Sequence, residues 1–333
     1  MNQTSQHVVI LDVARGVCAF IVALFHFLHF ESPQGSLFDT SDPFLNTIAP
    51  FMPGIVCVFF LISGYVLFLH LERSNYQLRN YGHFLLKRVI RLQLPLLACV
   101  LLILCINAVF QWYNGIPFTF SWNQFLSNIT LTANFTGEAW YNPIFWTLSI
   151  ELQFYVFIGL TFLLIRKSPF PWLLGLSVLA FALNCFCDTR GTVVEFGSYF
   201  TIGISMYLFH QKRFELIYIL ILSAIGILDF QVNQAPLYYI SSVLFIPIIL
   251  FLSFRSRIIE FAGEVSFSFY LIHGAVGGLF LYFTARYADQ FWQKLGLLII
   301  ALLISYAVGY IFYLLIEKTS ARLGKKITYR RNN

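Results

Sequence analysis

Arg15 and His26 lie in an otherwise apolar stretch, and their types and spacing suit the binding of one extended ligand. The stretch runs from Val8 to Phe30, and about 20 apolar residues suffice to cross a bilayer. The two residues are eleven positions apart, which is three helical turns plus roughly 20°, so they share one helix face about 16 Å apart. A cation and a titratable group are costly in lipid, which indicates a functional site.

Asp12 precedes Arg15 by three positions and is therefore its neighbour on the helix. The pair predicts a salt bridge in which Asp12, as an orienting residue, eases the burial of Arg15 or anchors the helix end. Alternatively, Arg15 contacts an anionic group that enters from the cytoplasm, and both can hold. Asp12 is about 21 Å from His26 by helix rise, so a direct pair of these two is not expected.

Two further segments combine small or basic residues with apolar neighbours. In FFLISGYVLF, Ser63 and Gly64 favour close helix packing, with room for a slender ligand as the alternative. In YGHFLLKRVIRLQLP, Arg88 and Arg91 fit positive-inside topology and lipid headgroup contact. The alternative is a phosphate site, because paired arginines bind phosphate well.

Glu151 and His273 are ionisable residues in two later apolar segments, WTLSIELQFY and FSFYLIHGAVGG. A carboxylate inside a membrane must be neutral, paired or solvated. Histidine is the side chain best suited to proton transfer near pH 7. Together with His26, these residues from three distant segments predict one polar chamber.

The composition is that of an integral membrane protein. The chain has 333 residues, of which 59% are hydrophobic and 11% charged, against roughly 25% charged in soluble proteins; its mean hydropathy is +0.75. We expect one all-α, polytopic transmembrane domain over residues 1–333, with a central chamber and no appended soluble domain. The apolar segments predict about ten helices, at residues 8–30, 46–70, 94–112, 143–165, 170–187, 192–210, 214–229, 236–254, 263–285 and 292–317.

The basic residues indicate the orientation in the membrane. With the N-terminus placed in the cytoplasm, seventeen of the 21 Lys and Arg fall on inner connections and the C-terminal tail. By the positive-inside rule, both termini are then cytoplasmic and the number of spans is even. The formal charge of +6 is thus a topology signal and does not indicate nucleic-acid binding, and no metal site is expected.

Five motifs together resemble the acyltransferase 3 family of membrane acyl-CoA-dependent O-acyltransferases. LDVARG followed by His26 is similar to the family's Arg-x10-His motif, and FFLISGY to its second-helix motif. RVIR resembles its Arg-x-x-Arg motif, WTLSIE its Trp-x-x-x-x-Glu motif, and FYLIH its aromatic-Leu-x-His motif. The matches run in the expected order from Leu11 to His273.

The resemblance implies transfer of an acyl group, usually acetyl, from cytoplasmic acyl-CoA to a hydroxyl. The expected acceptor is a sugar of a surface polysaccharide such as an O-antigen, or of a lipid-linked glycan, at the plasma (inner) membrane. His26 is then the essential residue, as general base or as a covalently acylated nucleophile, and Glu151 and His273 orient it or the acceptor. Acyl-CoA is a co-substrate held by Arg15, Ser63, Gly64, Arg88 and Arg91; no permanently bound cofactor is expected.

Two other classes of function are weighed against this interpretation. A proton-coupled transporter or flippase for a lipid-linked saccharide would use His26, Glu151 and His273 as a proton relay. Such transporters often show paired repeats, yet the Arg15–His26 pattern has no counterpart in the second half of the chain. A non-catalytic sensor or assembly subunit gives no reason for a cation and a histidine on one buried face.

Overall fold

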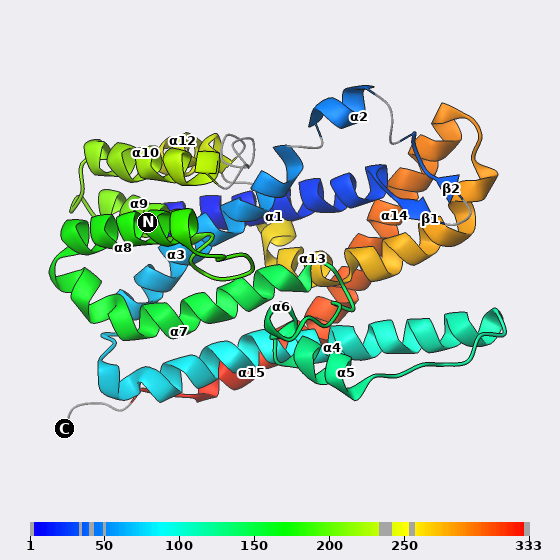
Figure 1. Ribbon diagram of the computed structural model, residues 1–333, viewed down its shortest axis with the longest axis horizontal. Coiled ribbons are helices and arrows are strands. Elements are labelled where there is room, and N and C mark those ends of the chain that lie inside the picture. Colours follow the sequence, from blue (N-terminus) through cyan, green and yellow to red (C-terminus); the bar gives the residue numbers. More distant parts are fainter. Residues whose placement is uncertain are drawn as a thin grey trace.

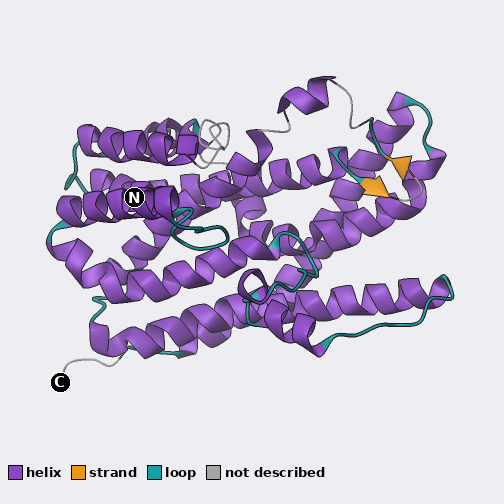
Figure 2. Ribbon diagram, in the orientation of Figure 1, coloured by secondary structure: helices purple, strands orange, loops and turns teal. Residues whose placement is uncertain are grey.

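The protein is a bundle of helices whose long members run side by side, as the computed structural model shows (Figure 1). The structure describes residues 3–32, 35–39, 43–48, 51–232, 242–252 and 257–329. Strands in this part are limited to a short antiparallel pair, β1 (Glu31–Ser32) and β2 (Gly35–Ser36), and nearly everything else is helix or loop (Figure 2). The described α-helices are α1 (Gln3–Leu28), α2 (Pro43–Ile48), α3 (Met52–Arg73), α4 (Tyr81–Tyr113), α5 (Trp122–Ile129), α6 (Ala133–Thr136), α7 (Phe145–Lys167), α8 (Pro169–Phe186), α9 (Gly197–His210), α10 (Leu216–Val232), α12 (Phe245–Phe251), α13 (Arg257–Thr284), α14 (Phe291–Phe312) and α15 (Lys318–Lys326). Three short helical segments complete the order: the 3-10 helices η2 (Leu78–Asn80) and η3 (Ala285–Tyr287), and the π-helix η4 (Tyr313–Glu317).

The all-α, polytopic architecture expected from the sequence is confirmed. Within the described residues, seven helical segments are long and apolar enough to cross a membrane, and Leu216–Asp229 is a shorter apolar helix. The expected span at 192–210 corresponds to the 14-residue α9. The expected span at 236–254 falls partly outside the described residues. Its described part includes the 7-residue α12.

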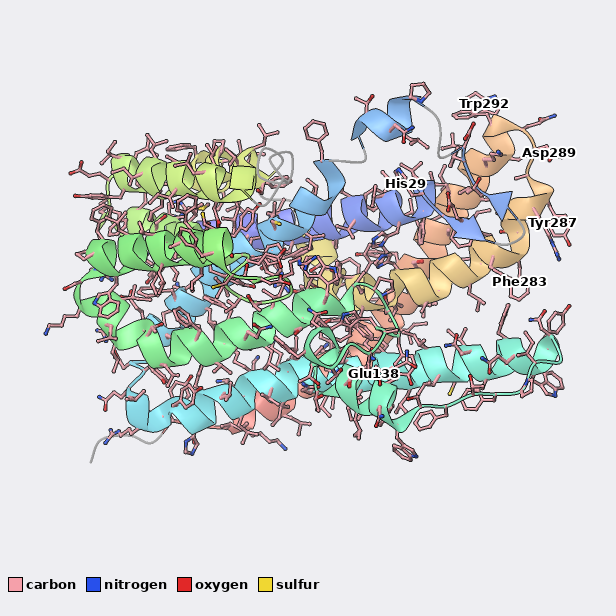
Figure 3. All side chains as sticks on the ribbon, viewed as in Figure 1. His29, Glu138, Phe283, Tyr287, Asp289 and Trp292 are labelled. Atoms are coloured by element: carbon pink, nitrogen blue, oxygen red, sulfur yellow. The ribbon has the colours of Figure 1, made fainter. Side chains whose placement is uncertain are left out.

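The two ends of the bundle are distinct. The helix α1 begins and α15 ends at one end of the molecule, which we call the terminal end (Figure 1). The β1–β2 pair and η3 lie at the opposite end, which we call the hairpin end (Figure 1). Tyr287, Asp289 and Trp292 also lie at the hairpin end, beyond His29, which directly follows α1 (Figure 3).

Close packing of α1 on α13 brings together two of the candidate motifs. A Cβ at Gly16 would lie 3.0 Å from the Gly263 nitrogen, and a Cβ at Gly263 would overlap the Asp12 carbonyl oxygen. Further along the same pair of helices, a Cβ at Gly277 would overlap the Phe27 ring. Small residues let membrane helices approach in this way, and the resulting register places His26 beside His273.

The helix α4 begins well before the segment that hydropathy marks. The sequence predicts a span at 94–112, whereas α4 covers Tyr81–Tyr113 and includes Arg88 and Arg91. Phe84, Arg88 and Leu92 are buried, and their spacing of four puts them on one inward face. Hydropathy detects only the uniformly apolar part of such a helix, so the prediction that these arginines sit in a connection was wrong.

Candidate active site

Two histidines from opposite ends of the sequence meet inside the bundle. His26 Nδ1 lies 2.8 Å from His273 Nε2, and their ring planes are inclined by only 10°. His273 is fully buried, whereas His26 is partly exposed. The sequence placed both residues in one polar chamber, and the structure brings them into direct contact.

Main-chain contact fixes the protonation of this histidine pair. His273 Nδ1 lies 2.7 Å from the Tyr270 carbonyl oxygen, which can only accept a hydrogen bond, so Nδ1 carries the proton. In neutral His273 the Nε2 atom is then an acceptor, and His26 Nδ1–H donates to it. The neutral form of His26 is left with an unprotonated Nε2, which is the lone pair that a general base needs.

A cavity of about 110 Å³, which we call the arginine cavity, lies between α1, α3, α4, α7 and α13. It is lined by Arg15, Phe59, Phe60, Ile62, Ser63, Val66, Leu67, Arg88, Arg91, Leu92, Thr147, Leu148, Glu151, Tyr155, Ser266, Phe267 and Tyr270. Three cations against one carboxylate make this lining net positive. Five of the predicted site residues (Arg15, Ser63, Arg88, Arg91 and Glu151) therefore meet at one cavity.

Arg88 is a buried cation that forms no ion pair with a carboxylate among the described residues. Its side chain is 8% exposed, and the guanidinium lies 5.9 Å from the Phe84 ring centre and 5.8 Å from that of Tyr155. Its Nε atom is buried and has no hydrogen-bond partner in the structure. Buried charges are normally paired, so this position suits an anionic ligand group.

Arg15 and Arg91 are less buried than Arg88. Arg15 forms the predicted ion pair with Asp12, at 3.8 Å between Arg15 Nη1 and Asp12 Oδ1, and its side chain remains 27% exposed. Arg91 is exposed where it lines the cavity. A long, partly exposed ion pair contributes little to stability, which leaves Arg15 available to an incoming anion.

Glu151 belongs to the arginine cavity and has no hydrogen bond to either histidine among the described contacts. Its Oε1 atom accepts hydrogen bonds from the Ser63 hydroxyl at 3.4 Å and from the Tyr155 hydroxyl. Gly64 faces away from the cavity, because a Cβ there would overlap the Phe200 carbonyl oxygen of α9. Gly64 thus has the packing role that the sequence favoured, and its contact with acyl-CoA stays a prediction.

Tyr270 connects the arginine cavity with the histidine pair, and the sequence analysis did not single it out. Its ring lines the cavity while its carbonyl accepts the His273 proton. The Tyr270 hydroxyl lies 3.1 Å from Thr147 Oγ1 on α7. The next residue of α13, Leu271, accepts a hydrogen bond at its carbonyl from the Asn142 side chain at 3.0 Å. Tyr270 is the aromatic residue of the FYLIH motif, three positions before His273, and that spacing was the available signal.

Glu317 is a second residue that the sequence analysis did not identify. It is buried at the end of the π-helix η4 and accepts a hydrogen bond from the Ser268 hydroxyl at 2.5 Å. Arg15 and Arg91 are close enough to interact with it electrostatically. π-Helical turns inside α-helices are frequent at functional sites, and here the turn carries a carboxylate that balances part of the arginine charge.

The comparisons with known proteins agree with this geometry. The acyltransferase 3 family, described as an acyltransferase domain, matches residues 8–314. No curated protein matches the chain, and no solved structure matches it. The match covers nearly the whole chain and includes every candidate residue described above except Glu317, so the protein belongs to the acyltransferase 3 family and is a multi-pass membrane acyltransferase.

Proposed function

We propose that the protein transfers an acyl group, usually acetyl, from cytoplasmic acyl-CoA to a sugar hydroxyl of a surface polysaccharide or lipid-linked glycan. The observation that carries this proposal is the hydrogen-bonded series from His26 through His273 to the Tyr270 carbonyl. It leaves His26 Nε2 free to accept a proton, and the arginine cavity begins at the same Tyr270.

The reaction follows from these positions. The donor's pyrophosphate binds at Arg15, Arg88 and Arg91, and its pantetheine arm extends past Ser63 toward the histidine pair. His26 Nε2 removes the hydroxyl proton as the sugar oxygen attacks the thioester carbon. When the carbon–sulfur bond breaks, His26 returns that proton to the departing thiolate, so free CoA and an O-acyl sugar leave.

Neutral His273 keeps His26 oriented throughout the reaction. Protonated His26 still donates from Nδ1 to His273 Nε2, so the acceptor stays in place through both proton transfers. A covalent acyl-His26 intermediate uses the same Nε2 atom and leaves the same contact to His273. Both routes therefore depend on the same geometry and make the same prediction for His26.

Labelled acetyl-CoA tests the proposal in membranes that hold the protein and the native glycan. We expect label in polysaccharide or lipid-linked glycan, removable by mild alkali because the new bond is an ester. Membranes without the protein provide the background. If acetyl-, succinyl- and longer acyl-CoA donors all leave the glycan unlabelled, acyl transfer to sugar is contradicted and a saccharide flippase becomes the better hypothesis.

A further inference from the structure

A second cavity, which we call the basic cleft, opens at the terminal end of the bundle. It has a volume of about 570 Å³ and lies between the end of α3, η2, the start of α4 and the segment that follows α15. Arg79, Lys87 and Lys325 line it, together with His70 and Tyr329, and none of the described residues that line it carries a carboxylate. Its position is distinct from that of the histidine pair.

The basic cleft continues the arginine cavity along the same two helices. On α3, Ser63 and Leu67 line the arginine cavity, whereas His70 and Ser74, the residue that caps α3, line the basic cleft. These positions are three or four residues apart and so lie on one helix face. On α4, Lys87 lines the cleft and the next residue, Arg88, lines the cavity. The two spaces therefore follow one another along α3 and α4.

The charge of the basic cleft is not compensated within the described part of the protein. None of Arg79, Lys87 and Lys325 is among the ion pairs found there. Glu72, near the end of α3, is held instead by Arg213 and by the Tyr207 hydroxyl, the latter at 2.7 Å.

The uncharged groups of the cleft also favour an anionic, aromatic ligand. The buried His70 Nε2 has no hydrogen-bond partner. Burial raises the pKa of the Tyr329 hydroxyl above its ordinary value, so the ring stays neutral at pH 7. The Lys87 ammonium lies 5.8 Å from the centre of that ring. The cleft thus offers cations beside an aromatic surface.

Building on the proposed function, we propose that the basic cleft binds the 3′-phosphoadenosine end of the acyl-CoA donor. Coenzyme A carries a ribose 3′-phosphate in addition to its pyrophosphate, and two separate anionic groups match two separate groups of cations. The basic cleft is the larger of the two spaces, at about 570 Å³ against about 110 Å³ for the arginine cavity, so the nucleotide is assigned to the cleft. The pyrophosphate then lies at Arg88 and the pantetheine arm reaches toward His26.

Binding of adenosine 3′,5′-bisphosphate to the purified protein in neutral detergent tests the site without requiring catalysis. The double variant Lys87→Ala/Lys325→Ala should bind it at least about tenfold more weakly, because each lost charged contact is worth that order of affinity. Lys318→Ala is the matched control, since this exposed lysine of α15 is outside the cleft lining. Equal affinity in wild type and double variant would overturn the proposal.

Acetyl transfer with two donors tests which phosphate the cleft recognises. For the wild type, KM should be about tenfold higher for acetyl-3′-dephospho-CoA than for acetyl-CoA, with kcat unchanged. In Lys325→Ala this difference should shrink or vanish. If the variant raises KM for both donors by the same factor, the cleft does not read the 3′-phosphate and the assignment is wrong.

The remaining outcomes separate this site from its alternatives. Bisphosphate binding that depends on Lys87 and Lys325, in a protein that acylates no glycan, would support the nucleotide site and contradict the proposed function. A lipid headgroup site predicts instead that vesicles of phosphatidylglycerol compete with the bisphosphate and lose their own binding in the double variant. That result, with unchanged KM values for both donors, would overturn the nucleotide assignment.

Discussion

At the scale of single residues, the account depends on how His273 holds His26. The Tyr270 carbonyl fixes the proton on His273 Nδ1, and His273 Nε2 fixes the proton on His26 Nδ1. An imidazole oriented by a hydrogen-bond acceptor in this way presents its other nitrogen to substrate, as in Ser-His-Asp sites. Here the acceptor is a neutral ring, so it orients His26 without adding a negative charge.

Replacing His273 by alanine should lower kcat for acetyl transfer about 10- to 100-fold, because His26 loses its orienting acceptor. KM for acetyl-CoA should stay within about twofold, since donor binding depends on the arginine cavity. His273→Gln should recover part of kcat, because its side-chain oxygen can accept the His26 Nδ1 proton. Steady-state kinetics decide this: a change confined to KM, or no difference between the alanine and glutamine variants, would contradict the orienting role.

The sequence predicted which of these residues lie inside the bundle better than which of them touch. Titratable side chains in apolar segments identified His26, Glu151 and His273, and their grouping in one chamber was inferred from residue type alone. The structure pairs the two histidines and assigns Glu151 to Ser63 and Tyr155. Which side chains touch depends on helix rotation and register, and a main-chain acceptor such as the Tyr270 carbonyl leaves no trace in residue type.

At the scale of helices, the register of α1 against α13 positions the histidine pair. Gly16 and Gly263 allow the two helices to touch, and Gly277 does so again beside Phe27. His26 and His273 lie between these contacts and are carried by the same two helices. Helix packing in the bundle is therefore directly coupled to the geometry of the site.

Gly263→Ala should displace α1 from α13, because the added Cβ overlaps the Asp12 carbonyl oxygen. We expect a loss of about 1–3 kcal/mol in stability, as for other overpacked contacts, and at least about a tenfold loss of acetyl transfer. Gly296→Ala on α14 is the matched control, since its Cβ meets no atom within 4 Å. Thermal unfolding in detergent and activity are measured together, and equal behaviour of the two variants would argue against a site set by helix register.

Helix positions were predictable where apolar runs are uninterrupted, and less so elsewhere. The expected spans at 143–165 and 170–187 agree closely with α7 and α8. The early start of α4 was missed because Lys87, Arg88 and Arg91 lower the hydropathy of a segment that is nonetheless helical. Its inward face, with Phe84, Arg88 and Leu92, is visible only as a spacing of four residues.

At the scale of the whole molecule, the bundle has one basic end and one end rich in exposed aromatic residues. The basic cleft lies at the terminal end, whereas Tyr287, Phe291 and Trp292 are exposed toward the hairpin end. Aromatic residues gather where a bilayer meets water. This polarity matches a donor that arrives at the terminal end and an acceptor that arrives at the hairpin end.

Cysteine labelling tests the orientation that this polarity requires. In a background with the exposed Cys105, Cys185 and Cys187 replaced by serine, Asp289→Cys should react with a membrane-impermeant maleimide on intact cells. Arg322→Cys, at the terminal end, should react only after permeabilisation, because we expect that end in the cytoplasm. The reverse pattern would place the acyl-CoA sites outside the cell and contradict the account.

The most direct test of the central claim is acetyl transfer by His26→Ala. Its control is His29→Ala, which removes another histidine three residues later, directly after the end of α1. Among the described hydrogen bonds, His29 Nδ1 contacts only the Phe25 carbonyl. With both variants expressed to the wild-type level and given labelled acetyl-CoA, the account predicts that His26→Ala loses at least about 100-fold in glycan labelling while His29→Ala retains it. Labelling by His26→Ala at the wild-type rate would show that the histidine pair is not the catalytic centre.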